Sequence, residues 1–165
     1  MHTMRNKLLR TAATLLCSLL VTGAIAAPLA PGQAVPPLVA SDQHDRPWSV
    51  APSTRILLFA ADKAASDLVT EALGERDADV LDARQAIFIA DIHAMPSMIT
   101  RVFALPALRA LPYAVGLGRD AALTADLPRR KGQVTLIMLD NGVIGSLRFL
   151  GTPEDILQAL DPSSR

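Results

Sequence analysis

The sequence predicts an α/β fold with one mixed sheet and helices on both of its faces. Two short, nearly continuous apolar runs, at 54–60 and 86–90, suit strands that are buried on both sides. The segment 62–75, whose apolar residues follow helical spacing, joins them, as in two parallel strands connected by a helix. Later, Asn141-Gly142 separates two further apolar runs and predicts a hairpin of antiparallel strands.

The first 26 residues have the features of a secretory signal peptide. Basic residues precede an apolar, uncharged stretch at 11–25, and its roughly 15 residues are fewer than the ~20 that a membrane-spanning helix needs. Ala24-Ile25-Ala26 fits a signal-peptidase site. We therefore expect a mature chain that begins at Ala27, lies in a bacterial periplasm and keeps no stable membrane span.

The mature chain is expected to hold one domain. Residues 27–36 are rich in alanine, proline and glycine and predict an extended lead-in. The domain then covers 37–162 and opens with a small hairpin around a polar turn at 41–46. A short helical turn is expected at 77–84, after the first long helix.

A punctuated helix is expected between Pro96 and Leu111. Proline suits the first turn of a helix, so Pro96 opens it, and Pro106 is expected to end or kink it. Its apolar residues share one face: Met98, Ile99, Val102 and Phe103. Met95 and Met98 could be copper ligands, but we expect them to pack in the core. Trp48 and Phe103 are expected to be core or hairpin anchors.

The remaining elements close the sheet. Thr152-Pro153 followed by two acidic residues has the usual composition of a helix start. The expected elements are a strand at 113–117, a polar loop at 118–132, strands at 134–139 and 143–150, and a helix after Thr152.

Composition excludes several classes of protein. The chain has 165 residues, which suggests one domain, and its 16 basic and 16 acidic residues favour no nucleic-acid partner. A hydrophobic content of 50% excludes a disordered protein. The single cysteine, Cys17, excludes a disulfide scaffold and a cysteine-rich zinc site. It lies in the predicted leader, so the mature chain would contain no thiol, and only a retained Cys17 would permit redox chemistry.

The order of elements resembles the thioredoxin-like fold in its larger, peroxiredoxin-type form. The resemblance covers about residues 35–160 and is carried by GQAVPPLVASDQHDRPWSV, by TRILLFAADKAA, and by QVTLIMLDNGVIGSLRFLG followed by TPEDILQAL. It implies redox cysteines between the first central strand and its helix. Here that place reads Ala60-Ala61-Asp62-Lys63-Ala64-Ala65. Thiol exchange and peroxidase chemistry both need a thiolate, so neither is expected.

The family's cis-proline has two alternative places in this sequence. It is either Pro112, before the strand at 113–117, or it is absent, with Gln133 standing before the strand at 134–139.

A narrower resemblance is to uncharacterised bacterial periplasmic proteins, some of which are labelled FAD- or FMN-containing dehydrogenases. It is carried by Asp42-Gln43, by Ala90-Asp91-Ile92 and by the MPxxIxRxFALPxxRxxPY stretch from Met95 to Tyr113. No glycine-rich dinucleotide fingerprint follows any expected strand. We therefore expect no flavin and no other cofactor.

Asp91 and His93 are the residues best placed for chemistry. They follow a central strand at its carboxyl end, where open α/β sheets place ligands. If the first hairpin folds over this end, they could bind a metal together with His44 and Asp45. Otherwise Asp91 caps a turn and His93 is a solvated loop residue.

His93 could also act as a general base, with a serine as the nucleophile. Ser41, Ser66 and Ser97 are available, but none lies in a nucleophile-elbow pattern. We assign no catalytic residue.

Two groups of basic residues could bind anions. Arg101 and Arg109 precede Tyr113 and could hold an anionic ligand or partner, or they are ordinary solvent-facing arginines. The run Arg129-Arg130-Lys131 could touch lipid headgroups or an acidic partner, or it is a solvated loop.

We therefore expect a redox-inactive, periplasmic thioredoxin-like protein that recognises a protein or peptide. The rival is a metal-dependent or other enzyme that uses the region of Asp91 and His93. The expected binding residues are Asp62, Lys63, Asp91, His93, Arg101, Arg109, Pro112 and Tyr113.

Overall fold

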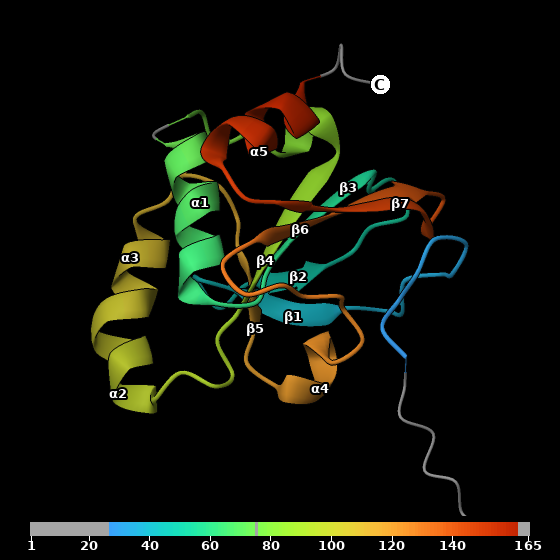
Figure 1. Cartoon of the computed structure of the whole chain (residues 1–165). Helices are drawn as coiled ribbons and strands as arrows, with labels where there is room; N and C mark the ends of the chain where they lie inside the picture. Colours follow the sequence, from blue (N-terminus) through green and yellow to red (C-terminus); the bar gives the residue numbers. More distant parts are fainter. Residues whose placement is uncertain (1–26, 75, 162–165) are drawn as a thin grey trace, which may run out of the picture.

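The computed structural model describes residues 27–74 and 76–161, so the predicted leader and its cysteine lie outside the described residues. Within these residues seven strands form one mixed sheet in the order β2-β1-β5-β4-β3-β6-β7 (Figure 1). β3 (Ile56–Ala60) pairs in parallel with β4 (Ala86–Asp91) and antiparallel with β6 (Val134–Asp140). The expected mixed α/β sheet is confirmed.

Two hairpins form the edges of the sheet. β1 (Val39–Asp42) and β2 (Pro47–Ser49) form the first, and β1 pairs antiparallel with β5 (Gly116–Gly118). At the other edge β6 pairs with β7 (Val143–Leu150) across the Asn141-Gly142 turn. Both turn residues have a positive φ, of 50° and 80°, which is the backbone of a type I′ hairpin.

The longer helices lie on one face of the sheet. α1 (Lys63–Leu73), α3 (Leu105–Arg109) and α5 (Pro153–Leu160) bury their apolar residues there, and the short η1 (Asp82–Arg84) leads into β4. The other face is covered by α4 (Ala121–Thr124), by the first hairpin and by the lead-in at 27–36. Helices therefore lie on both faces, with α4 contributing Leu123 to the second.

Alternation along β3 separates two cores. Leu58 packs among the helices α1, α3 and α5, whereas Leu57 and Phe59 point to the opposite face. Trp48 packs in that second core and is buried, as expected. The central strand is therefore covered on both sides, which explains its continuous apolar run.

The helix expected between Pro96 and Leu111 is present at 97–109. α2 (Ser97–Ile99), a π-helical segment η2 (Thr100–Ala104) and α3 follow one another without a break. Pro106 therefore does not end the helix. It lies in the first turn of α3, where the missing N–H is tolerated, and the backbone N–H of Leu105 bonds to the Thr100 carbonyl in the π-helical segment before it.

The expected core packing of Met98 and Phe103 is wrong. These side chains are 74% and 64% exposed, and Ile99 and Val102 are exposed beside them. The continuous helix reaches the core only through its carboxyl-terminal half, where Leu105 and Leu108 are buried. Helical spacing identified the apolar face but not whether a neighbouring element covers it.

Two further differences concern the segment between β4 and β6. The expected strand at 113–117 is shorter, because the side chain of buried Gln43 accepts from Val115 N and donates to the Tyr113 carbonyl, both at 2.8 Å. A side chain thus replaces strand pairing there. The polar loop contains α4, whose N-cap Asp120 accepts from Ala122 N.

No helix in the described part of the chain is long and apolar enough to cross a membrane.

Close packing of Trp48 on Gly116 gives a test of the second core. A Cβ atom at Gly116 would lie 2.5 Å from Trp48 Cε2, so Gly116→Ala is expected to lower the free energy of unfolding by about 1–3 kcal/mol. Urea unfolding followed by the fluorescence of Trp48, the single tryptophan, measures it. Gly145→Ala is the control, because its nearest neighbour would be 3.8 Å away. Equal unfolding midpoints for the two variants would contradict the packing described.

Candidate functional site

A carboxylate occupies the turn where β3 leads into α1. Asp62 is the N-cap of α1, and its Oδ1 accepts from Ala65 N at 3.0 Å. Its Oδ2 accepts from Gly132 N at 2.8 Å, which ties the loop before β6 to the start of the helix. Lys63 beside it is exposed and pairs with Asp67 at 2.6 Å. The turn between β3 and α1 is therefore closed by an acidic capping residue.

Asp91, at the end of β4, is the centre of a second polar cluster. Its side chain is only 2% exposed and accepts four hydrogen bonds. Oδ1 accepts from His93 N at 3.1 Å and contacts His93 Nδ1 at 2.6 Å. Oδ2 accepts from Thr124 Oγ1 at 2.7 Å and from Arg129 at 3.1 Å. Asp91 thus joins β4, the turn after it, α4 and the loop before β6.

The hydrogen bonds decide the charge of Asp91. Burial by itself raises the pKa of this carboxyl, but the hydrogen bonds from His93 and Thr124 outweigh it and hold the pKa below its ordinary value. Asp91 is therefore ionised at neutral pH, with Arg129 as its counter-ion. The same guanidinium also donates to the Thr124 carbonyl and lies over the Phe59 ring, 5.3 Å from its centroid.

The three basic residues of the loop before β6 are exposed, as in a solvated loop, but two of them have partners within the molecule. Arg129 is bound to Asp91, and Arg130 lies over the Phe149 ring at 4.2 Å. Lys131 is exposed. The sequence run looked like three free charges, but two of them are packed on aromatic rings.

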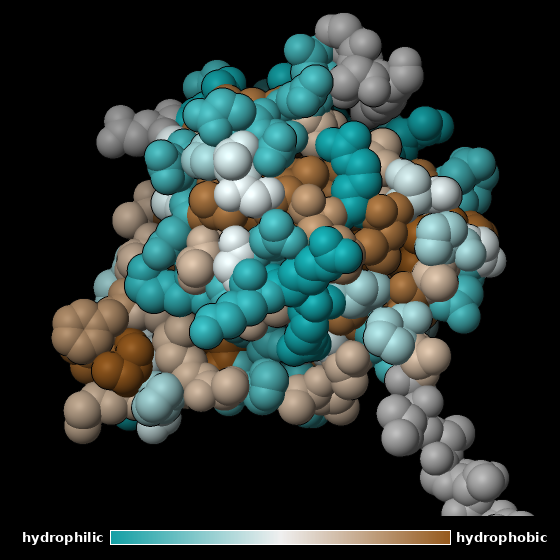
Figure 2. Space-filling model, in the orientation of Figure 1, coloured by the Kyte–Doolittle hydropathy of each residue, from teal (hydrophilic) through white to brown (hydrophobic). Residues whose placement is uncertain are grey.

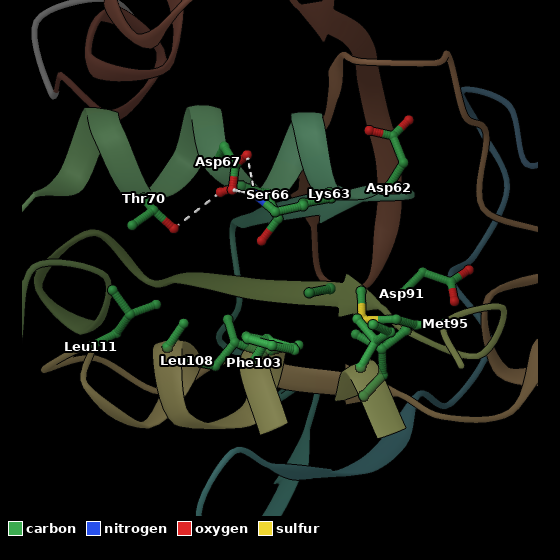
Figure 3. A pocket seen from close by; sticks show the side chains of 15 residues that line it. Asp62, Lys63, Ser66, Asp67, Thr70, Asp91, Met95, Phe103, Leu108 and Leu111 are labelled. Carbon is green, nitrogen blue, oxygen red and sulfur yellow. Dashed lines mark hydrogen bonds and ion pairs between the residues drawn. The ribbon is translucent and has the colours of Figure 1, made fainter. Parts of the chain in front are cut away.

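A groove of about 360 Å³ opens between α1 and the helix at 97–109, above the end of β4. Figure 3 shows its two unlike walls, with polar side chains on α1 and apolar side chains on the opposite helix. The polar wall consists of Asp62, Lys63, Ser66, Asp67 and Thr70. Asp91 lines the end of the groove, and the other lining residues are apolar: Ala90, Ile92, Met95, Ile99, Phe103, Ala104, Ala107, Leu108 and Leu111.

The apolar wall continues onto the surface of the molecule. Met98 and Val102 are exposed next to Ile99 and Phe103, which line the groove. Figure 2 shows a group of apolar atoms exposed where Figure 1 places α2. We call the four side chains Met98, Ile99, Val102 and Phe103 the apolar stripe.

The groove gathers three of the predicted binding residues. Asp62, Lys63 and Asp91 line it, and His93 lies beside it through its bond to Asp91. Arg101 is exposed and is not among the lining residues.

Arg109 and Tyr113 lie elsewhere. Arg109 Nε donates to the Gln43 carbonyl at 2.8 Å, and its guanidinium pairs with Asp45, which also binds Arg119. Arg109 therefore fastens the helix to the first hairpin.

Tyr113 is 2% exposed and belongs to the core between the sheet and the helices. Its hydroxyl is a buried side-chain polar atom without a hydrogen-bond partner, and no other such atom occurs in the described residues. Burial raises the pKa of Tyr113 to about 12, although the nearby Thr70 side chain opposes the rise. Thr70 itself donates to the Ser66 carbonyl.

Pro112 is exposed before β5, and the peptide bonds of the described residues, including the bond before Pro112, are trans. The segment that reaches the start of α1 is instead the one before β6, at Gly132 and Gln133. Of the two places considered for a cis-proline, the one before β6 lies next to α1, and this sequence has Gln133 there instead of a proline.

The proposed metal ligands do not form a cluster. His44 lies in the β1–β2 turn, where its backbone N–H donates to Asp42, and His93 is held by Asp91. Burial by itself raises the pKa of Asp42, but the hydrogen bonds from Arg46 and His44 outweigh this effect, so the pKa lies below its ordinary value. Among the residues that the structure describes, no three His, Cys, Asp or Glu side chains could hold a metal together.

Sequence reasoning missed Thr124, Arg129 and Gly132 as parts of the site. Each contacts an acidic residue that lies between 33 and 70 positions earlier in the chain. No local pattern marks such pairs, because they are brought together only by the crossing of the chain between β5 and β6.

Solved structures of other proteins share this fold. The thioredoxin domain of a thiol-disulfide oxidoreductase from Bacteroides vulgatus is 11% identical, with a TM-score of 0.54 over 83% of this chain and 99% of that one. Prx3 from Vibrio vulnificus is 21% identical, with a TM-score of 0.52 over 81% and 99%. The peroxidoxin BcpB from Mycobacterium tuberculosis is 12% identical, with a TM-score of 0.51 over 82% and 97%. These likenesses show the thioredoxin-like fold.

No protein-family model matches the sequence, and no curated protein matches it.

The cluster around Asp91 is expected to stabilise the fold in a pH-dependent way. Because the pKa of Asp91 is lowered in the folded state, its contribution is complete above the ordinary carboxyl pKa of ~4 and is lost as the pH falls further. Asp91→Asn is expected to lower the free energy of unfolding by about 2 kcal/mol at pH 7, with a smaller difference below pH ~4. Urea unfolding at both pH values measures this, with the exposed Asp79→Asn as control. A difference that does not change with pH would contradict the assignment.

Proposed function

We propose that this chain is a periplasmic thioredoxin-like binding protein that recognises a protein or peptide without thiol chemistry. The observation that carries the proposal is the groove between α1 and the helix at 97–109, together with the uncovered apolar stripe beside it. Exposed apolar side chains that adjoin a groove are the usual mark of a binding surface.

The turn at the start of α1 supports a role without redox chemistry. Residues 60–65 contain no cysteine, and the sole cysteine of the sequence is at position 17. Asp62 in this turn bonds to two backbone N–H groups, so its carboxylate is engaged in holding the turn and the loop together. Such an arrangement keeps a surface rigid, as a binding site requires.

The walls of the groove suggest how a polypeptide would be held. Phe103, Leu111 and their neighbours would bury apolar side chains of the partner, which supplies most of the free energy of binding. Ser66, Thr70 and Asp67 on α1 offer hydroxyl and carboxylate groups for orientation. The binding residues are therefore those of the groove, and Arg109 and Tyr113 support the structure behind it.

The contact between Asp91 and His93 favours a second candidate, an enzyme that uses His93 as a general base. Asp91 holds His93 Nδ1 at 2.6 Å, and the His93 side chain is 33% exposed. This is the arrangement that orients an imidazole for proton transfer. If this candidate is correct, the purified protein will turn over a substrate without any added protein, and His93→Ala will abolish the turnover.

Processing of the leader is tested by native mass spectrometry of the protein isolated from its own periplasm without chelators. The expected mass is that of a chain starting at Ala27 with no adduct. A mass that includes Cys17 would restore a possible thiol, and a bound metal or organic group would favour the enzyme.

The groove is tested by site-specific photo-crosslinking. A benzoylphenylalanine at Ala107, an exposed groove residue, is expected to crosslink to a polypeptide in the periplasm. Removing the apolar contacts with Ile99→Ser and Phe103→Ser together should reduce the crosslinked fraction at least about tenfold. Val39→Ser is the matched control, because Val39 is also an exposed apolar side chain but lies on β1. Crosslinking that survives the double variant would refute the groove as the binding site.

A further inference from the structure

The architecture of the groove indicates what conformation and charge its occupant has. We propose that the partner inserts a basic amphipathic α-helix between α1 and the helix at 97–109. This inference rests on the proposed function, because it describes the polypeptide that the same groove would take.

Both walls of the groove are helices, and this decides between a helical and an extended occupant. An extended peptide gains most of its affinity by pairing its backbone with a free strand edge. The lining residues come from α1, from the end of β4 and from the helix at 97–109, and β4 is already paired with β3 and β5. The groove therefore offers no strand edge, whereas a helix satisfies its own backbone and needs only side-chain contacts.

The spacing of the lining residues matches a helical occupant. On the apolar wall Ile99, Phe103 and Ala107 recur every fourth residue of the helix at 97–109, and Leu111 lines the groove just after the helix ends. On α1 Lys63, Ser66 or Asp67, and Thr70 recur every three to four residues. Each row is a ridge along its helix, and a third helix packs by placing its own ridge between such rows. Within the helix the apolar row, from Ile99 to Ala107, spans about 12 Å, the length of about two helical turns.

Several of the side chains that line the groove are small. Ala90 comes from β4, and Ala104 and Ala107 come from the helix at 97–109 beside Phe103. Large side chains of an incoming helix, such as leucine, would fill the space above the alanines. The apolar stripe extends this surface toward the start of the helix at 97–109, where Met98 and Val102 are exposed.

The charges of the lining residues favour a basic partner. Three carboxylates, of Asp62, Asp67 and Asp91, line the groove together with one ammonium group, that of Lys63. Arg129 neutralises Asp91 and Lys63 pairs with Asp67, so the α1 wall keeps a net negative charge from Asp62. Lysine or arginine residues on the flank of the occupant that faces α1 would complement it.

Three fluorescein-labelled peptides of about 14 residues test this proposal, with binding to the mature chain measured by anisotropy. The first contains leucine and lysine arranged so that the leucines share one helical face, the second replaces lysine with glutamate, and the third alternates leucine and lysine and so favours a strand. The first is expected to bind at least about tenfold more tightly than the other two.

Two variants locate the binding. Phe103→Ser should weaken binding of the first peptide at least about tenfold, and Asp67→Lys should weaken it by about the same factor. Val39→Ser and the exposed Asp79→Lys are the controls and should leave the affinity unchanged.

Each other result overturns the proposal in a recognisable way. If the strand-forming or the glutamate peptide binds as tightly as the first, the conformation or the charge is wrong and the proposed function stands. If no peptide binds while crosslinking at Ala107 persists, the helical occupant is wrong and the groove still binds protein. If no peptide binds and the protein instead binds phosphatidylcholine vesicles through Phe103, the stripe contacts a membrane and both proposals fail.

Discussion

The buried carboxylate of Asp91 is the interaction on which this end of the molecule depends. A charge at the end of β4 is costly to bury unless donors surround it, and here the donors come from the following turn, from Thr124 and from Arg129. Because Arg129 is bonded to Asp91, the loop before β6 is held in place. That loop then presents Gly132 N to Asp62, and Asp62 caps α1. The polar wall of the groove therefore has its position because Asp91 has its charge.

The groove itself results from uneven helix packing. α1 packs chiefly against α5 on the same face of the sheet, and the helix at 97–109 is anchored by Leu105 and Leu108 and by the bond of Arg109 to the first hairpin. The remaining faces of the two helices are left opposite each other with small residues between them. Because α1 and the helix at 97–109 are each held by their own contacts, the groove between them does not need an occupant to stay open.

Elements with local signals were predictable from the sequence. The Asn141-Gly142 turn, the cap at Thr152 and the apolar runs of β3 and β4 depend on a few adjacent residues, and each element formed where it was expected. Asp91 was singled out because it follows a strand at its carboxyl end, and Asp62 and Lys63 were singled out from the resemblance to the thioredoxin-like fold. All three line the same groove.

The features that were missed depend on contacts between distant segments. Gln43 bonds to backbone groups that lie 70 and 72 residues further along the chain. Arg129 has an acidic partner only because the fold brings Asp91 to it. The exposure of Phe103 reflects the absence of a covering element, which hydrophobic spacing cannot report. Fold class follows from local patterns, whereas the surface of the groove follows from tertiary arrangement.

The capping role of Asp62 has a consequence for the reactivity of any thiol introduced at this turn. The amino end of a helix lowers the pKa of a thiol placed there, and an adjacent carboxylate works against that effect. A cysteine that arose by mutation at Ala61 or Ala64 would meet the negative charge of Asp62, which also holds the neighbouring loop. Replacing Asp62 would relieve the repulsion but release both Ala65 N and Gly132 N. A single cysteine introduced into this turn would therefore keep a higher pKa than the helix end alone would give it, and the second substitution needed to lower that pKa would loosen the turn.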